Sequence, residues 1–480
     1  MESAAKPLSI VSLLFSALLL IALAGCGGTT SSSSNSAGTS NSGGNGSGGT
    51  ASGGPGGSTS GGTSGTTSGG TSGTTSGGTS GTSSGGSGGT GGGTGGSGSG
   101  GMSGGGSGSG GGSGSGGGGT SSGSTGTTYV YSAVYSNGGG IVGYSQDSTG
   151  TLSSVPGSPF LQKGTGAMSA LAATNGYVYM ANQPGIAVPT QLIQYKADPT
   201  SGSLIQVGTA DAGTKLSGDS EMRRLLVNPS GKVMYAVFQF TIISYALNGN
   251  GTPSVIKETA PSTDSVWAFD FMPNGPYAYA AIQNGNPKVG FQEPEIHLLN
   301  VGADGSVTDN RSVLTLPAAG LPGDLKIDPS GKYVVVSTGQ TNNELGVYAI
   351  QSDGSLKDVP GSPFSTGTQE LAFISFDSSG KFLYVLSNQQ EQPQAEELQV
   401  FSFDASTGAL AQVQDLTLPN EQMATWLTVD GNFLYLINVE SGATTSVITA
   451  YDRDATTGQL TEASKTTIQN PIGQTEVVHF

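Results

Sequence analysis

The stretch DPSGKYVVVSTGQTNNELGVYAIQSDGSL, residues 328–356, contains both elements from which the fold is predicted. It begins with a turn, in which Asp328 precedes Gly331, and a run of β-forming residues follows from Tyr333. It ends with a second turn around Gly354. Glycine accepts the positive φ angle that tight turns need, and apolar residues flank both turns. The stretch therefore predicts two tight turns with strands on either side.

Both elements recur through the C-terminal part of the chain at intervals near 50 residues. The first turn recurs from residues 174, 228, 272, 328, 377 and 429. The second, a TG-x-L type of hairpin, recurs with its glycine at Gly150, Gly202, Gly251, Gly305, Gly354, Gly408 and Gly458. A period of this length that contains about four short strands is typical of a propeller blade, and no convincing helical pattern interrupts it.

The ends of the repeat region predict how the ring closes. Six copies of the first turn follow an inner strand, namely SALAAT, RRLLVN, WAFDFM, DLKIDP, LAFISFD and TWLTVD. The first blade begins directly at Thr128 without such a strand, and TEVVHF at residues 475–480 has the missing pattern. We therefore predict an all-β, seven-bladed propeller over residues 128–480, closed by the C-terminal strand. Closure removes two exposed sheet edges, which are sites of association.

The N-terminus has the pattern of an export signal. Residues 1–25 contain Lys6 and then an apolar run that is short for a membrane-spanning helix. The ending LAGC, residues 23–26, resembles the lipobox of bacterial lipoproteins, in which the cysteine is lipidated. Cys26 is the single cysteine of the chain, so no intrachain disulfide can form. Glycine rather than aspartate follows it. By the same resemblance, we expect a lipid anchor at the outer membrane or cell surface.

A linker follows the anchor. Residues 26–127 contain no charged or aromatic side chain, and glycine, serine and threonine make up most of them. Such a segment cannot bury enough apolar surface to offset the entropy of ordering, so we expect it to be disordered. As a Gly-rich coil its mean reach is roughly 55 Å, enough to hold a domain away from a membrane surface.

The charge of the chain excludes one class of partner. The sequence has 32 acidic and 16 basic residues, and all of them except Glu2 and Lys6 lie in residues 128–480. Nucleic acids and anionic lipids require clustered Lys and Arg. We therefore expect no nucleic-acid partner.

The repeat pattern quoted above resembles the lactonase-type seven-bladed propellers, the group similar to 6-phosphogluconolactonase. The resemblance extends over all of residues 128–480, but it rests on turn glycines, strand aromatics and TG-x-L hairpins, which are scaffold positions. It implies the fold strongly and a lactone hydrolase only weakly, because one fold supports many activities. The domain has four arginines, few for a phosphosugar ligand, which would favour several cations.

Charged side chains near the starts of the inner strands are the candidate site. Lactone hydrolysis needs a base that activates water and a cation or donor that stabilises the oxyanion. Glu221, Arg223 and Arg224 are the candidate catalytic residues. The candidate binding residues at the channel mouth are Asp264, Asp324, Glu370, Glu421 and Glu476. Solvated charges and ion pairs between blades are the alternative interpretation of the same residues.

A metal site is a weaker alternative. In EPEIH, Glu293, Glu295 and His297 occupy every second position, so on a strand they share one face, which is compatible with metal ligation. An exposed strand face explains the same pattern. We expect no cofactor.

Two hypotheses from different classes remain. The first is a tethered, lactonase-like hydrolase of a sugar lactone or another lactone. The second is a non-enzymatic binding or scaffold module that recognises a protein or polysaccharide of the cell envelope. A hydrolase must lose turnover when Arg224 or Glu221 is replaced, whereas a binding module has no turnover to lose.

Overall fold

The structure, a computed structural model, describes most of the repeat region. The described residues are 127–134, 139–161, 168–183, 190–212, 222–261, 265–283, 285–286, 290–291, 293–316, 322–338, 344–367, 371–387, 396–419, 422–440, 444–470 and 472–480. The predicted signal and lipidation site, and the predicted linker up to residue 126, lie outside them. In the described part of the chain, no helix is long and apolar enough to cross a membrane.

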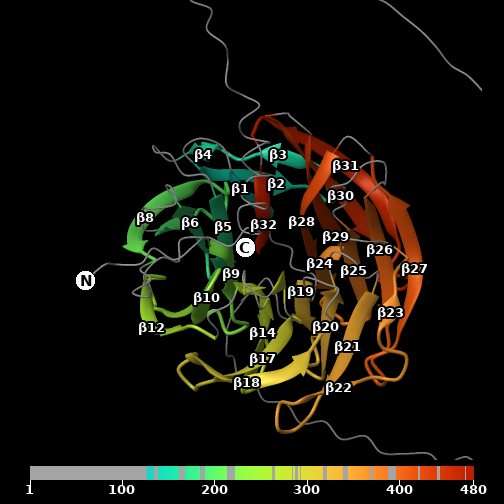
Figure 1. The fold of residues 1–480 in the computed structure, drawn as a ribbon. Coiled ribbons are helices and arrows are strands. Elements are labelled where there is room, and N and C mark those ends of the chain that lie inside the picture. Colours follow the sequence, from blue (N-terminus) through green and yellow to red (C-terminus); the bar gives the residue numbers. More distant parts are fainter. Residues whose placement is uncertain are drawn as a thin grey trace, which may run out of the picture. The chain divides into compact units, whose positions relative to one another are not determined.

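The strands form seven antiparallel sheets of four or five strands within the described residues, and the sheets surround a centre as blades (Figure 1). The first, innermost strands are β32 (Ile472–His479), β5 (Met168–Thr174), β9 (Met222–Val227), β13 (Ser265–Phe271), β19 (Pro322–Ile327), β24 (Leu371–Phe376) and β28 (Gln422–Asp430), for blades 1 to 7 in order. The second strands are β1 (Thr128–Val134), β6 (Tyr177–Gln183), β10 (Val233–Phe238), β14 (Tyr277–Gln283), β20 (Tyr333–Thr338), β25 (Phe382–Ser387) and β29 (Phe433–Glu440).

The outer half of each blade continues the same order. The third strands are β2 (Gly140–Gln146), β7 (Gln191–Ala197), β11 (Ile242–Leu247), β17 (Glu295–Val301), β21 (Glu344–Ile350), β26 (Glu397–Phe403) and β30 (Ser446–Arg453). The outermost strands are β3 (Leu152–Ser154) with β4 (Phe160–Leu161), β8 (Leu204–Asp211), β12 (Pro253–Thr259), β18 (Val307–Thr315), β22 (Leu356–Asp358) with β23 (Phe364–Ser365), β27 (Leu410–Thr417) and β31 (Leu460–Ile468). A small ribbon of β15 (Gly285–Asn286) and β16 (Gly290–Phe291) lies between β14 and β17 in the sequence. The predicted all-β, seven-bladed propeller is confirmed.

The C-terminal strand closes the ring as predicted. β32 pairs antiparallel with β1, with Thr128 opposite His479, and it occupies the innermost position of blade 1. His479 Nε2 lies 2.6 Å from Asp430 Oδ2 of blade 7, and this hydrogen bond raises the pKa of the imidazole. The Phe480 ring packs edge-on against Tyr129 at 5.8 Å. The last two residues therefore attach the chain end to both neighbouring strands.

The repeated glycines connect each blade to its neighbour. All seven predicted TG-x-L glycines have φ between +70° and +85°, the left-handed region that favours glycine. A Cβ atom at Gly202 of blade 2 would lie 2.3 Å from the Tyr129 ring of blade 1. Gly150 of blade 1 lies in the same way against Phe433 of blade 7. The hairpin contact therefore continues across the point where the ring closes.

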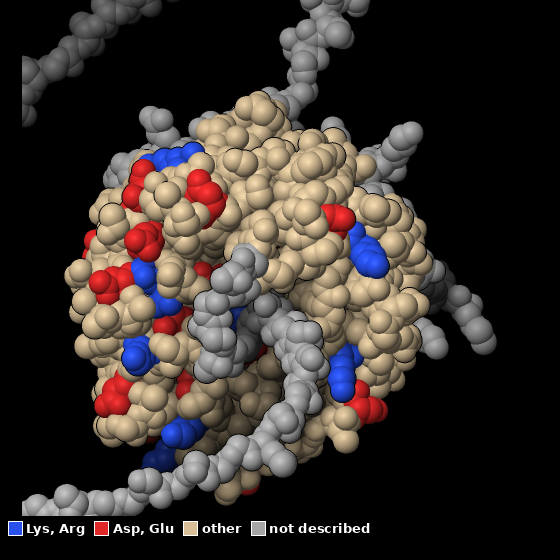
Figure 2. Space-filling view, turned by 180° about the vertical axis from the view of Figure 1, so that it is seen from behind, with Lys and Arg blue, Asp and Glu red and all other residues tan. Residues whose placement is uncertain are grey.

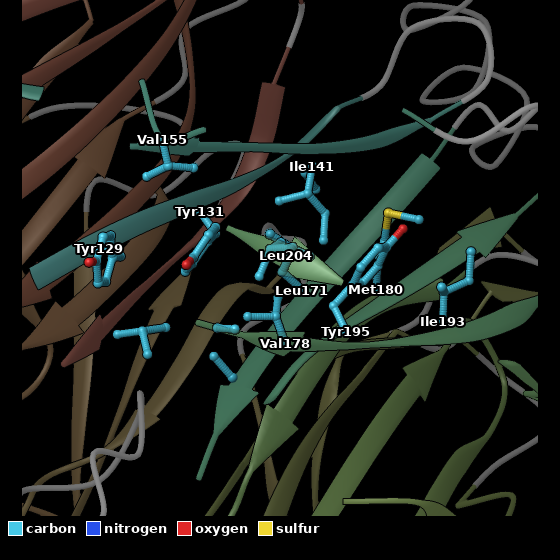
Figure 3. Close-up of a cluster of buried hydrophobic side chains, with 14 residues drawn as sticks. Tyr129, Tyr131, Ile141, Val155, Leu171, Val178, Met180, Ile193, Tyr195 and Leu204 are labelled. Carbon is cyan, nitrogen blue, oxygen red and sulfur yellow. The ribbon is translucent and has the colours of Figure 1, made fainter. Parts of the chain in front are cut away.

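The hydrophobic core lies between adjacent blades. Figure 3 shows the cluster between blades 1 and 2, where Tyr131 and Ile141 of blade 1 pack with Leu171 and Met180 of blade 2. All four side chains are fully buried. Similar clusters lie between the other pairs of neighbouring blades, so stability is distributed around the ring.

The strand order defines two faces. The hairpins that join first to second strands (inner hairpins) and third to fourth strands (outer hairpins) lie at one end, which we call the hairpin face. The second strands end, and the innermost strands begin, at the opposite end, which we call the connection face. Most of the connections from second to third strands, and from one blade to the next, lie outside the described residues.

Candidate functional site

The predicted site residues divide into two groups. Glu221, Asp264, Glu370 and Glu421 lie outside the described residues. Arg223, Arg224, Asp324 and Glu476 are described, and all four are on innermost strands. The four residues were expected near the starts of the inner strands at the channel mouth, and all four lie within those strands rather than in loops.

Arg224 connects two blades that are not neighbours. Its Nη1 donates to Asp324 Oδ1 at 2.8 Å, which joins β9 of blade 3 to β19 of blade 5. Both side chains are nearly inaccessible, with Arg224 8% and Asp324 1% exposed. An ion pair this well buried persists only if its remaining groups are also satisfied. It therefore holds one side of the central channel together.

Asp324 meets that requirement. Its Oδ1 also accepts the N–H of Leu325 at 2.8 Å, and Oδ2 accepts the N–H of Ile374 in blade 6 at 3.2 Å. Its own N–H donates to Ser337 Oγ at 2.7 Å. The carboxylate is an anchor between blades, which corresponds to the ion-pair alternative in the sequence analysis rather than to an exposed binding group.

Aromatic rings lie beside both arginines. The Arg224 guanidinium carbon is 5.2 Å from the ring centre of Trp426 on β28 of blade 7. Arg223 lies over Trp267 of blade 4 at 4.3 Å and donates to Ser265 Oγ at 3.1 Å. Cation–π contacts of this kind are worth about 0.5–2 kcal/mol and keep a guanidinium plane in a fixed orientation. From blade 3, Arg224 therefore contacts blades 5 and 7, which places its charge among the innermost strands at the centre of the ring.

The closing strand contributes an amide and a carboxyl to the same region. Gln474 Nε2 donates to the backbone oxygens of Leu171 at 2.6 Å and Leu225 at 3.1 Å, in blades 2 and 3. It also lies 3.3 Å from Glu476 Oε1. Glu476 lies inside β32, which begins at Ile472, and its side chain is buried opposite Tyr131.

Two buried carboxyls were missed by the sequence analysis. Asp270 of blade 4 accepts the N–H groups of Phe271 and Ile327, and burial raises its pKa to about 6. Glu396, which directly precedes β26, accepts the N–H of Ala424 at 2.8 Å, and burial raises its pKa to about 7. In the sequence, Asp270 lies inside a predicted strand and Glu396 at the end of a long polar loop. Neither position indicates that the carboxyl is buried.

Glu396 and Arg224 contact the same inner strand. Glu396 hydrogen-bonds to Ala424 of β28, and Arg224 lies over Trp426, two residues further along. A register shift separates these two positions in the pairing of β28 with β29. A carboxyl that titrates near neutrality and a guanidinium thus lie along one irregular strand, a combination that is frequent at functional sites.

The EPEIH residues form a different local arrangement. Glu295 and His297 share one face of β17 as predicted, with His297 Nε2 3.3 Å from Glu295 Oε2. The other ring nitrogen, Nδ1, lies 3.1 Å from Asp309 Oδ1 on β18, and Glu293 is exposed. Within the part of the chain that the structure describes, no group of three His, Cys, Asp or Glu residues has the arrangement of a metal site.

Surface charge is mixed. Figure 2 shows Lys and Arg side chains beside Asp and Glu side chains across one face, without a large area of either sign among the residues it colours. A nucleic-acid surface would require a continuous basic area.

The strand order defines the fold as a seven-bladed propeller. Residues 271–420 and 389–473 match the family model described as "Lactonase, 7-bladed beta-propeller". The resemblance predicted from the repeats is thereby confirmed. No curated protein matches the chain in sequence.

Solved structures agree on the fold. A putative 6-phosphogluconolactonase from Bacteroides uniformis superposes with a TM-score of 0.57 at 17% identity, covering 73% of this chain and 99% of that one. The periplasmic gluconolactonase of Pseudomonas aeruginosa gives a TM-score of 0.56 at 15% identity, with coverages of 73% and 99%. A putative 6-phosphogluconolactonase from Bacteroides fragilis gives 0.56 at 15%, with coverages of 74% and 98%. At these identities the likeness establishes the architecture alone.

Proposed function

We propose that this propeller hydrolyses a lactone in its central channel, at the end that faces the connections. The observation that carries the proposal is Arg224, a buried guanidinium that extends from blade 3 to Asp324 of blade 5 and lies over Trp426 of blade 7. The lactonase family match and the gluconolactonase-like neighbours support the choice of substrate class.

The reaction needs a group that stabilises negative charge on the carbonyl oxygen. A water molecule attacks the lactone carbonyl carbon, and the carbonyl oxygen becomes an oxyanion in the tetrahedral intermediate. Arg224 has five N–H donors, of which Nη1 binds Asp324. The remaining donors suit the oxyanion, and a water-poor channel strengthens that interaction.

The reaction also needs a base near its working pH. Glu396, with a pKa of about 7, accepts the proton of the attacking water. When the ring C–O bond breaks, the leaving alkoxide takes that proton back, and the product is a hydroxy acid. Glu221 is the other candidate base from the sequence, and it lies outside the described residues.

We further propose that the propeller is exported and lipid-anchored through Cys26, and that the linker holds it at the cell envelope. The LAGC ending and the composition of residues 26–127 support this. The substrate would then be an extracellular or periplasmic lactone rather than a cytosolic phosphosugar lactone.

The test is a pH-stat assay of the full chain in detergent with sugar lactones, phosphorylated sugar lactones and aliphatic lactones, after subtraction of spontaneous hydrolysis. We expect acceleration with at least one lactone and its loss in the double variant Arg224→Met/Asp324→Asn, which leaves no unpaired charge. Lys465→Ala, which removes an exposed cation of β31, serves as the control and keeps full activity. A lack of acceleration with every lactone contradicts the proposal.

A further inference from the structure

One backbone position is equivalent in six blades and can be compared around the ring. The last residue of the third strand donates its N–H to a carbonyl of the inner hairpin in its own blade. We call the boundary between neighbouring blades at the hairpin face a seam. The residue at this backbone position is the seam position, because its side chain lies in that boundary. The residues are Ala197, Leu247, Val301, Ile350, Phe403 and Arg453, in blades 2 to 7.

Large side chains fill the seam in the last two blades. Phe403 packs edge-on against Tyr333 at 5.5 Å and Phe376 at 5.1 Å. Arg453, whose side chain is 6% exposed, binds Asp377 of blade 6 at 3.3 Å and the backbone oxygen of Gly431 at 2.6 Å. These contacts occupy the seam positions of blades 6 and 7.

Shorter side chains leave the seams of blades 3 and 4 open. Beside Leu247 and Val301 lies a cavity of about 630 Å³ that the hairpins of blades 2, 3 and 4 enclose. A second cavity of about 220 Å³ adjoins it and shares Asn228, Ser230 and Val301. The larger volume is within the range of small-molecule sites, and the two together form a groove across two seams.

At two sets of equivalent positions this groove lacks the carboxylates that other blades carry, and its charged lining residues are one cation, Lys232, and one carboxylate, Asp304. Thr174 and Asn228 stand where the inner hairpins of blades 2 and 3 begin, and blades 5 to 7 have Asp328, Asp377 and Asp430 at that position. Asn248 and Gly302 begin the outer hairpins of blades 3 and 4. Blades 1, 2, 6 and 7 have Asp147, Asp198, Asp404 and Asp454 there. A chain with a net charge of −16 therefore has a nearly neutral, amide-rich groove at this site.

The polar atoms of the groove suit hydroxyl groups. Asn175 uses its amide N–H on the Gly231 oxygen and Asn248 uses its own on the Thr252 oxygen, which leaves both carbonyl oxygens to accept from a ligand. Lys232 contributes an ammonium donor and Tyr177 a half-buried aromatic ring to the wall. Donors, acceptors and aromatic rings in a cleft without net charge match a polyhydroxylated ligand.

We infer that the groove across blades 2 to 4 binds a neutral oligosaccharide. The site is on the hairpin face and shares no described residue with the channel, so it is independent of lactone hydrolysis. The extended shape favours several sugar units over one. The lining disfavours uronic acid chains, because its one cation, Lys232, is offset by the carboxylate of Asp304.

Calorimetry of the full chain in detergent tests this with neutral pentasaccharides built from glucose or N-acetylglucosamine, and with a galacturonic acid pentamer. We expect at least one neutral pentasaccharide to bind and the acidic pentamer to bind at least tenfold more weakly. Leu247→Phe and Val301→Phe copy the residue that fills the seam of blade 6, and each should weaken binding at least tenfold. Ile350→Phe makes the same kind of change in blade 5, where we expect binding to stay unchanged.

Three results would overturn the inference. The first is that no neutral pentasaccharide binds at a sugar concentration of about 1 mM, which would detect weak affinities. The second is unchanged binding in both Phe variants, and the third is tighter binding of the acidic pentamer. Melting curves of each variant show whether it is folded. Lactone hydrolysis in the same variants should be unchanged, so the two proposals fail or succeed separately.

Discussion

The channel and the hairpin face are built from the same seven repeats, but equivalent positions are kept from blade to blade far more strictly at the hairpin face than in the channel. At the hairpin face the seven TG-x-L glycines keep one conformation, and deviations occur one side chain at a time, as at Arg453. In the channel almost no position repeats. Arg224, Asp324 and Gln474 each occur in one blade and contact two others, and Glu396 of blade 6 contacts blade 7. Repetition produces the scaffold, and the exceptions to it mark the places where binding or chemistry is expected.

The largest expected effect comes from the closing strand. Deletion of residues 475–480 removes most of β32, exposes the edge of β1 and separates blade 1 from blades 2 and 7. We expect the chain to lose its cooperative thermal transition or to aggregate, as measured by circular dichroism and size-exclusion chromatography. Deletion of Phe480 alone should retain the transition, because the Tyr129 contact is a single ring pair. A truncated chain that melts like the full chain contradicts closure.

The second effect tests whether the channel depends on its ion pair. Arg224→Met leaves Asp324 buried without its cation, which typically costs about 3–5 kcal/mol of unfolding free energy. Adding Asp324→Asn should recover most of that loss, because no buried charge then remains unpaired. Denaturant titration of both variants measures the difference. Equal stability of the single and double variants would show that the two side chains are not coupled.

The third effect depends on pH. The pKa of Glu396 rises from 4.5 to about 7 on folding, so the folded state holds a proton that the unfolded state has released. This stabilisation is fully present below pH 4.5 and is lost as the pH rises through about 7, with a size of about 3 kcal/mol. Glu396→Gln keeps an acceptor for the Ala424 N–H and should flatten the fall in stability over this window.

Wild-type and variant unfolding free energies at pH 4.5 and pH 8 provide the comparison. Asp270, with a pKa of about 6, contributes to the same window in both proteins and cancels in the difference. Identical pH profiles would mean that Glu396 is not buried as described.

The smallest effect separates the conformation of a hairpin glycine from its contact with the next blade. Gly202→Ala places a methyl group against the Tyr129 ring, whereas Gly367→Ala has a similar φ of +75° and open space around it. Both carry the backbone penalty of about 1–2 kcal/mol. We expect Gly202→Ala to cost about 1–3 kcal/mol more, from the steric clash alone. Equal losses in denaturant titrations would remove the proposed role of the contact between blades.

Sequence predicted the fold because the fold depends on repeated, local signals. The turn glycines and the missing first strand of blade 1 predicted seven blades and their closure, and both are confirmed. The start of β32 was placed three residues late. Isoleucine at 472 and glutamine at 474 are not distinguishable from a loop without the pairing partner β1.

The site was less predictable, because it depends on contacts between blades that no periodicity encodes. Arg224 was predicted as a candidate catalytic residue near the start of an inner strand, but the sequence did not indicate its partners, Asp324, 100 positions away, and Trp426 in blade 7. Glu396 gave no signal because burial, not residue type, makes it unusual. The seam position could not be identified from the sequence, because the residues at it differ from blade to blade. The equivalent backbone hydrogen bond in six blades identifies it.

The most direct test of the account is the rate of lactone hydrolysis in Arg224→Met/Asp324→Asn relative to wild type, with the better substrate from the lactone panel and Lys465→Ala as the control. Removal of one oxyanion donor typically lowers the rate about 10²–10³-fold, and this is the loss we predict for a variant that still melts as a folded propeller. An unchanged rate in that folded variant would contradict the claim that chemistry occurs in the channel.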